Sequence, residues 1–259
     1  GISKLIICSM FKLTMSLFFC AAAAFNAASL QGIVPHTNSP RMVPHMVLED
    51  LAKKQNPVIG YWDPLNLALL NFWGQGDEAT VGFLRHAEIK HGRVAMAAFV
   101  GYIVQSNGIT FPWAPFNAIP AGLSPPAQWD ALPEAAKLQI ILFVGFLEVY
   151  SEHSFILEKE GEKHYMRGGK PGYFPTFDTM VHPVPFNLYD PFGFFKSMTA
   201  EQKEKRLNME VNNGRLAMIG IMGFISAAVV PGSVPALTGL LQPYSGNVMA
   251  PFDANFHFL

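Results

Sequence analysis

The side chains of this sequence that could carry chemistry gather in a nine-residue motif that occurs twice. Residues 88–96 read EIKHGRVAM and residues 210–218 read EVNNGRLAM, so both copies follow the pattern E-x-x-[H/N]-G-R-x-A-M. A carboxylate, a lone pair on His or Asn and a guanidinium can together bind a metal ion or form ion pairs. The repeat indicates two structurally equivalent segments, and each copy runs directly into an apolar stretch. The charged half of each motif is therefore expected at the mouth of a membrane helix.

Helical geometry decides which side chains of one motif copy lie together. Residues three positions apart share a helix face, so Glu88 and His91 point the same way, as do Glu210 and Asn213. Each arginine lies five positions beyond its own glutamate, which is about 140° round a helix of 3.6 residues per turn. The arginine therefore needs a partner outside its own motif.

The other motif copy supplies the complementary charges. A charge next to lipid is costly unless it is paired, so we predict that Glu88 pairs with Arg215 and Arg93 with Glu210. These reciprocal pairs would lock two crossed helices about a pseudo-twofold axis. Small residues at the predicted crossing leave room for a close neighbour; they are Gly92, Ala95, Gly214, Ala217, Gly220 and Gly223.

The repeat also offers positions for metal ligation. A glutamate held by an arginine keeps a lone pair on its second oxygen, and His91 and Asn213 each offer one more. A transition-metal site would not readily exchange His for Asn, whereas magnesium, a hard cation that favours oxygen, tolerates both. Four positions with one ligand each suit magnesium in a tetrapyrrole ring, which needs a single axial ligand.

The doubled motif resembles the first and third transmembrane helices of the light-harvesting chlorophyll-binding superfamily, over a stretch from about Ile59 to Val230. The resemblance implies an all-α membrane protein with three transmembrane helices, of which the first and third are crossed and related by the pseudo-twofold repeat. It also assigns roles to the motif residues. Chlorophyll magnesium ligands would be Glu88, His91, Glu210 and Asn213, with Arg93 and Arg215 as the cross-pairing residues.

Two further ligands and a second short repeat follow from the same resemblance. The middle helix of the family carries a Gln and a Glu ligand, and the matching residues are Gln139 and Glu148, one position further apart than expected. An aromatic-Asp-Pro sequence precedes each motif copy, at Asp63 and Asp190, where we expect turns. In the family these segments lie near the ends of two carotenoids.

Composition and patterning are consistent with a small membrane protein. Of the 259 residues, 50% are hydrophobic and only 14% charged, whereas soluble proteins have roughly a quarter charged residues. The net charge of −1 argues against a nucleic-acid partner.

Helices are predicted over 77–105, from 133 onward and over 200–230, although no apolar run alone reaches the roughly 20 residues of a membrane span. Residues 106–136 are too rich in Pro and Gly for helix, and His86 is expected to be solvated or to cap its helix.

Residues 1–42 resemble a plastid-targeting presequence, which leaves 43–259 as the chlorophyll-binding antenna domain. This segment contains Lys4, Lys12 and Arg41 but no acidic residue, and its apolar run over 13–24 ends in small residues, as a signal-peptide core does. An N-terminal membrane anchor is the alternative. Both cysteines, Cys8 and Cys20, lie here.

The expected function is a light-harvesting antenna of the plastid thylakoid membrane, most similar to the fucoxanthin or peridinin type found in algae with complex plastids. The resemblance implies chlorophyll a, chlorophyll c and a fucoxanthin-type or peridinin-type carotenoid as cofactors. It implies a photosystem core, neighbouring antenna subunits and thylakoid lipids as partners, and no enzymatic activity. A photoprotective relative of the same family is one alternative. A di-iron carboxylate enzyme is another, because Glu88 and His91 form one E-x-x-H pattern, and a transporter with sites at a repeat interface is a third.

Overall fold

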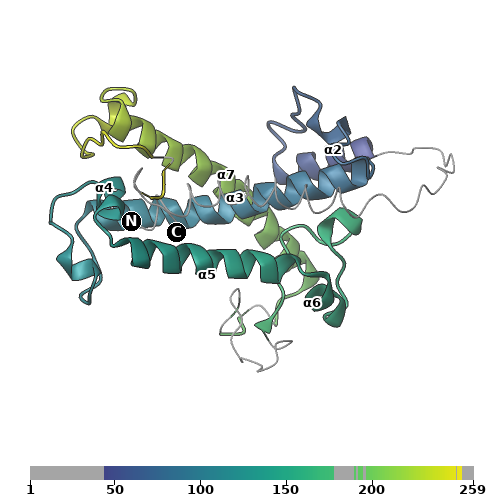
Figure 1. Ribbon diagram of the computed structural model, residues 1–259. Helices are drawn as coiled ribbons and strands as arrows, with labels where there is room; N and C mark the ends of the chain where they lie inside the picture. Colours follow the sequence, from purple (N-terminus) through teal and green to yellow (C-terminus); the bar gives the residue numbers. More distant parts are fainter. Residues whose placement is uncertain (1–43, 178–189, 191, 195–196, 249, 253–259) are drawn as a thin grey trace. The chain divides into compact units, whose positions relative to one another are not determined.

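A computed structural model describes residues 44–177, 190, 192–194, 197–248 and 250–252 (Figure 1). The predicted presequence, residues 1–42, lies outside the described residues. The described part of the chain is built from helices and turns and contains no strand, which agrees with the predicted all-α fold.

Three helices are long and contain all six predicted ligands. They are α3 (Asp77–Ser106) and α7 (Ala200–Val229), of 30 residues each, and α5 (Glu134–Glu152), of 19 residues. Shorter helices are α2 (Pro44–Gln55), α4 (Pro125–Asp130) and α6 (Ser154–Lys159), with 3-10 turns at Leu67–Leu69, Phe116–Ala118, Tyr165–Arg167 and Pro235–Leu237. Judged by length and hydropathy together, none of the helices in the described residues qualifies as a membrane span.

The short helix α4 corrects one prediction, because residues 106–136 were expected to be too rich in Pro and Gly for helix. Pro125 and Pro126 occupy its first turn, where a missing N–H removes no intrahelical hydrogen bond and the fixed φ favours helix. Trp129 is almost fully buried, and its indole N–H donates to the carbonyl oxygen of Pro251 at 2.8 Å. Proline in the first turn is therefore compatible with this helix, and the buried Trp129 anchors it.

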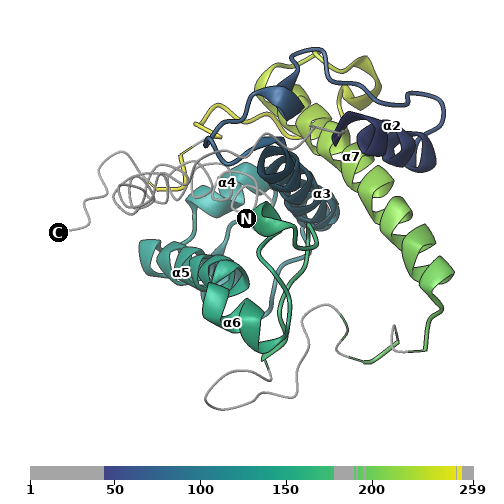
Figure 2. The same ribbon diagram turned by 90° about the vertical axis from the view of Figure 1, so that its right-hand side faces the viewer.

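The described residues form two compact units. The first, called here the motif unit, comprises residues 44–93 and the described part of 146–215. It contains α2, α6 and the charged half of both motif copies, and α2 lies beside α7 in it (Figure 2). The second, called the aromatic unit, comprises residues 94–145 and the described part of 216–252. The three long helices each contribute one part to each unit.

The aromatic unit has a small core built on the apolar half of the repeat. Ala98 and Tyr102 from α3 pack with Ile221 from α7, and the ring of Phe99 stacks on that of Phe224 with the centroids 4.8 Å apart. A Cβ atom on Gly220 would collide with the ring of Phe99. Alternating small and aromatic residues therefore let these two helix segments pack closely.

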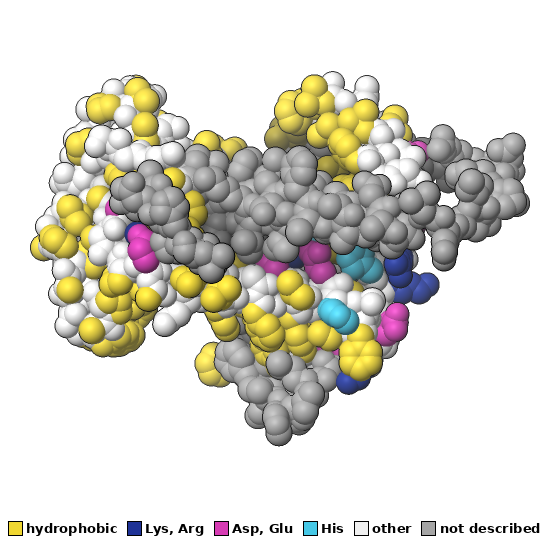
Figure 3. Space-filling model, viewed as in Figure 1, with side chains coloured by type: hydrophobic (Ala, Val, Ile, Leu, Met, Phe, Trp, Pro, Cys, Tyr) yellow, Lys and Arg dark blue, Asp and Glu magenta, His cyan; other side chains and the backbone are white. Residues whose placement is uncertain are grey.

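Many large apolar side chains nevertheless remain exposed on the long helices. On α5 the exposed residues are Leu142, Phe143, Phe146 and Val149, and hydrophobic side chains gather over this helix in Figure 3. On α7, Leu216 and Ile219 are exposed by 70% and 72%. Such continuous apolar surface on a folded protein indicates that something apolar covers it.

Candidate functional site

The site is organised by the crossing of α3 and α7 in the motif unit. The helices approach most closely at equivalent positions of the two motif copies, Gly92 and Gly214. A Cβ atom on Gly92 would lie 3.0 Å from the Cα atom of Gly214, and one on Gly214 would lie 2.8 Å from the Cα atom of Gly92. Backbone therefore faces backbone, which brings the charged side chains of each helix within reach of the other.

Two reciprocal ion pairs flank this crossing. Arg93 Nε lies 2.5 Å from Glu210 Oε1, and Arg215 Nε lies 2.7 Å from Glu88 Oε1. All four side chains are half-buried, with exposed fractions between 21% and 39%. Each arginine thus neutralises the glutamate of the other motif copy, so these four charges balance one another.

The pairing occupies only one oxygen of each carboxylate. Within the described part of the chain, no hydrogen bond reaches Oε2 of Glu88 or Oε2 of Glu210. A carboxylate whose charge is compensated but whose second oxygen is open can donate a lone pair to a hard cation such as magnesium. The geometry therefore provides two equivalent single-ligand positions.

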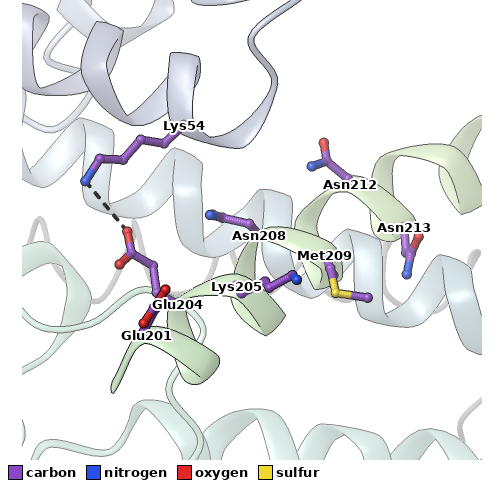
Figure 4. A pocket seen from close by; sticks show the side chains of 8 residues that line it. All are labelled: Lys54, Glu201, Glu204, Lys205, Asn208, Met209, Asn212 and Asn213. Atoms are coloured by element: carbon purple, nitrogen blue, oxygen red, sulfur yellow. Dashed lines mark ion pairs between the residues drawn. The ribbon is translucent and has the colours of Figure 1, made fainter. Parts of the chain in front are cut away.

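His91 and Asn213 lie three positions beyond these glutamates. His91 Nδ1 is 2.7 Å from the carbonyl oxygen of Ala87. Because a carbonyl oxygen can only accept, Nδ1 donates, and in the neutral imidazole Nε2 then carries the lone pair. A histidine that ligates a metal through one ring nitrogen typically donates a hydrogen bond from the other, as Nδ1 of His91 does here. Asn213 is exposed at the edge of a hollow of about 460 Å³ beside α2 and α7 (Figure 4). The hollow is lined by Lys54, Glu201, Glu204, Lys205, Asn208, Met209, Asn212 and Asn213.

The two predicted ligands on α5 have different surroundings. Gln139 is exposed in the aromatic unit. Glu148 is half-buried in the motif unit, where its Oε2 atom lies 2.7 Å from Lys90 Nζ. Sequence reasoning gave Lys90 no role, although it lies inside the first motif copy.

A glycine in the loop after α6 was also missed. The carbonyl oxygen of Gly172 accepts a hydrogen bond from Arg93 Nη1 at 2.7 Å, and its N–H donates to His86 Nδ1 at 3.0 Å. The expectation that His86 is solvated or a helix cap was wrong, because it is 4% exposed and its ring stacks on Tyr165 at 3.9 Å. The glycine-rich sequence GGKPG over 168–172 was the available signal, since glycine lets a loop backbone approach a helix closely.

Asp63 and Asp190 begin turns, as predicted. Asp63 Oδ1 accepts a hydrogen bond from the N–H of Leu67 at 2.9 Å, and Asp190 Oδ1 accepts one from the N–H of Phe194 at 2.7 Å. Burial raises the pKa of Asp63, but the backbone N–H groups of Ala68 and Leu67 outweigh it and hold this pKa below its ordinary value. Both turns use the same bond, four residues forward, so the structural repeat extends beyond the nine-residue motif.

Comparisons with known proteins cover most of the chain. The model of the family described as chlorophyll A-B binding protein matches residues 48–229, a range that includes both motif copies. The chain is 30% identical over 222 residues to a chloroplastic fucoxanthin-chlorophyll a-c binding protein of Trieres chinensis, which is 83% of this chain and 96% of that protein. It is 32% identical over 206 residues, 76% of this chain and 89% of the relative, to fucoxanthin-chlorophyll a-c binding protein F of Phaeodactylum tricornutum. It is 31% identical over 219 residues, 80% of this chain and 88% of the relative, to protein F of Macrocystis pyrifera.

Proposed function

The chain belongs to the chlorophyll A-B binding protein family, and from this premise we propose that it is an antenna that binds chlorophyll a, chlorophyll c and a fucoxanthin-type carotenoid. The relatives named above are fucoxanthin-chlorophyll a-c binding proteins of the chloroplast. The observation that carries the proposal is the pair of charge-balanced glutamates with one open oxygen each. When bound, the pigments absorb light and pass the excitation on, and this role includes no covalent step.

The donor set fits chlorophyll magnesium. Glu88, Glu210 and Asn213 would each provide one oxygen, and His91 would provide Nε2, which is consistent with a cation that favours oxygen but accepts nitrogen as a single axial ligand. Arg93 and Arg215 would hold the two glutamates in place without occupying the ligating oxygen. Gln139 and Glu148 are proposed as two further ligands. The turns that begin at Asp63 and Asp190 are proposed to lie near the ends of two carotenoids.

We further propose that α3, α5 and α7 cross the thylakoid membrane. Helices of 30 and 19 residues are about 45 and 28 Å long, compared with a hydrocarbon thickness of about 30 Å. The motif charges on α3 and α7 are paired across helices, which reduces their cost in lipid. The exposed apolar side chains on α5 and α7 would then face lipid and pigment. The proposed partners are a photosystem core, neighbouring antenna subunits and thylakoid lipids.

Spectroscopy of the native protein tests the function directly. The protein, purified in mild detergent, is expected to show chlorophyll absorption bands, and its fluorescence excitation spectrum is expected to show carotenoid-sensitised chlorophyll emission. Pigment extraction would then identify the chlorophylls and the carotenoid. Native protein isolated without pigment would contradict the proposal.

His91→Leu tests a single ligand position. Leucine fills similar space without a lone pair, so the variant is expected to fold and to lose about one chlorophyll per polypeptide while the other ligand positions remain. The measurement is the ratio of chlorophyll to protein after reconstitution with extracted pigments. His153→Leu, which replaces an exposed histidine outside the motif, is the matched control and should keep the full count. An unchanged count in His91→Leu would remove His91 from the ligand set.

A further inference from the structure

One position of the repeat differs in charge between the two motif copies, and its two residues make different contacts. The third residue is Lys90 in the first copy and Asn212 in the second. The side-chain amide of Asn212 donates to the carbonyl oxygen of Gln55, the last residue of α2, at 2.8 Å. Lys90 instead faces α5, where two carboxylates lie. The charge of the third motif residue therefore matches its contacts: the neutral amide of Asn212 contacts a neutral carbonyl group, and the ammonium of Lys90 contacts two carboxylates.

The ammonium of Lys90 is enclosed by those acids. Its Nζ atom lies 2.7 Å from Glu148 Oε2 and 2.9 Å from Glu152 Oε1, and the Lys90 side chain is only 14% exposed. The Glu148 side chain is 21% exposed, whereas that of Glu152 is 39% exposed. Glu152 also accepts a hydrogen bond from the hydroxyl of Tyr165. Glu148 is thus the more buried of the two acids, and it makes the shorter contact with the ammonium that both acids share.

Glu148 repeats the arrangement of the two motif glutamates. In each of the three cases a cation from one helix engages one carboxylate oxygen on another helix, namely Arg93 with Glu210, Arg215 with Glu88, and Lys90 with Glu148. Within the described residues, no hydrogen bond reaches Glu148 Oε1. The third pair therefore has the same open oxygen as the first two.

We propose that Lys90 is the positioning residue for a third carboxylate ligand: it neutralises Glu148 from α3 and leaves Glu148 Oε1 to ligate chlorophyll magnesium. This inference rests on the proposed function and deepens it. Without the ammonium, Glu148 would be a largely buried carboxylate with no compensating charge, which is strongly disfavoured. Glu152 holds the ammonium from its other side and does not itself ligate.

The test separates charge compensation from simple bracing of α3 against α5. Reconstitution with chlorophyll a, chlorophyll c and fucoxanthin is carried out for the wild type and for Lys90→Met, Glu148→Gln and the double variant. Lys90→Met is expected to lose about one chlorophyll per polypeptide, because the remaining carboxylate is uncompensated. Glu148→Gln should keep the full count, since a neutral amide oxygen ligates magnesium and needs no cation. The double variant should recover the count lost in Lys90→Met. Lys163→Met, which removes an exposed lysine outside this cluster, is the control and should keep the full chlorophyll count.

Other results of these experiments would contradict either the role of Lys90 or the proposed function. A double variant that stays one chlorophyll short would overturn the proposal. If Lys90 only braces α3 against α5, its loss has the same effect with Glu or with Gln at position 148. Glu148→Leu with a full count would also overturn it, by removing Glu148 as a ligand. Thermal unfolding followed by far-ultraviolet circular dichroism gives a second readout, in which bracing alone predicts equal midpoints for Lys90→Met and the double variant. A wild type that binds no pigment would contradict the proposed function instead.

Discussion

Arg215→Leu is expected to abolish the stable pigmented complex. The substitution removes the cation 2.7 Å from Glu88 Oε1 and leaves a half-buried carboxylate without its ion-pair partner. Removing one partner of a fully buried pair costs about 3–5 kcal/mol, and the partial exposure of this pair favours the lower end, about 3 kcal/mol. Glu88 would also lose the contact that orients it as a ligand. The measurement is the yield of pigmented complex after reconstitution and separation on a density gradient.

Two comparison variants isolate this effect. Lys203→Leu removes a cation from an exposed position of the same helix and should leave the yield unchanged, because a solvated charge contributes little to stability. Glu88→Leu combined with Arg215→Leu should be more stable than Arg215→Leu alone, since no charge is then left unpaired. Normal assembly of Arg215→Leu would show that the ion pair is dispensable.

Gly214→Ala is expected to disrupt the helix crossing although it adds a single methyl group. The new Cβ atom would lie 2.8 Å from the Cα atom of Gly92, a distance at which backbone must move, so α3 and α7 would separate. Overpacking of this kind costs about 1–3 kcal/mol, and both ion pairs would be stretched in addition. The expected results are a lower thermal unfolding midpoint and a lower yield of pigmented complex.

Gly223→Ala makes the same chemical change on the same helix in open space. Apart from the neighbouring backbone of the same helix, no atom lies within 4 Å of the added methyl group. The variant should therefore gain roughly 0.5–1 kcal/mol from the better helix propensity of alanine. The opposite sign of the two effects would identify contact at the crossing as the cause. Equal effects of the two substitutions would contradict the crossing.

The long helices and the crossing could be predicted from the sequence because their causes are local and repeated. The spacing of Glu88 and Arg93 within one motif copy rules out an internal pair, and the second copy then leaves one complementary solution, which α3 and α7 adopt. The observed starts of α3 at Asp77 and α7 at Ala200 equal the predicted ones.

The contacts that could not be predicted depend on elements without periodicity. His86 is buried by a loop that returns about eighty positions later in the chain, and only the approach of Gly172 and Tyr165 reveals it. Lys90 has no visible partner in its own helix, because Glu148 and Glu152 are contributed by α5. Binding of pigment at any position is a property of the chain with its ligands, so the roles of all six proposed ligands stay predictions.

The two motif copies share the residues that meet at the helix crossing, so the contact alone does not determine which helix packs against which neighbour. Because the same residue types face each other at Gly92 and Gly214, the contact is self-complementary, like that between two copies of one subunit in a symmetric dimer. Such a contact cannot by itself tell α3 from α7. The distinction comes from position three of the motif, where Lys90 selects the acids of α5 and Asn212 selects the end of α2. The motif position at which a lysine replaces an asparagine thereby gives each of the two helices its own neighbour.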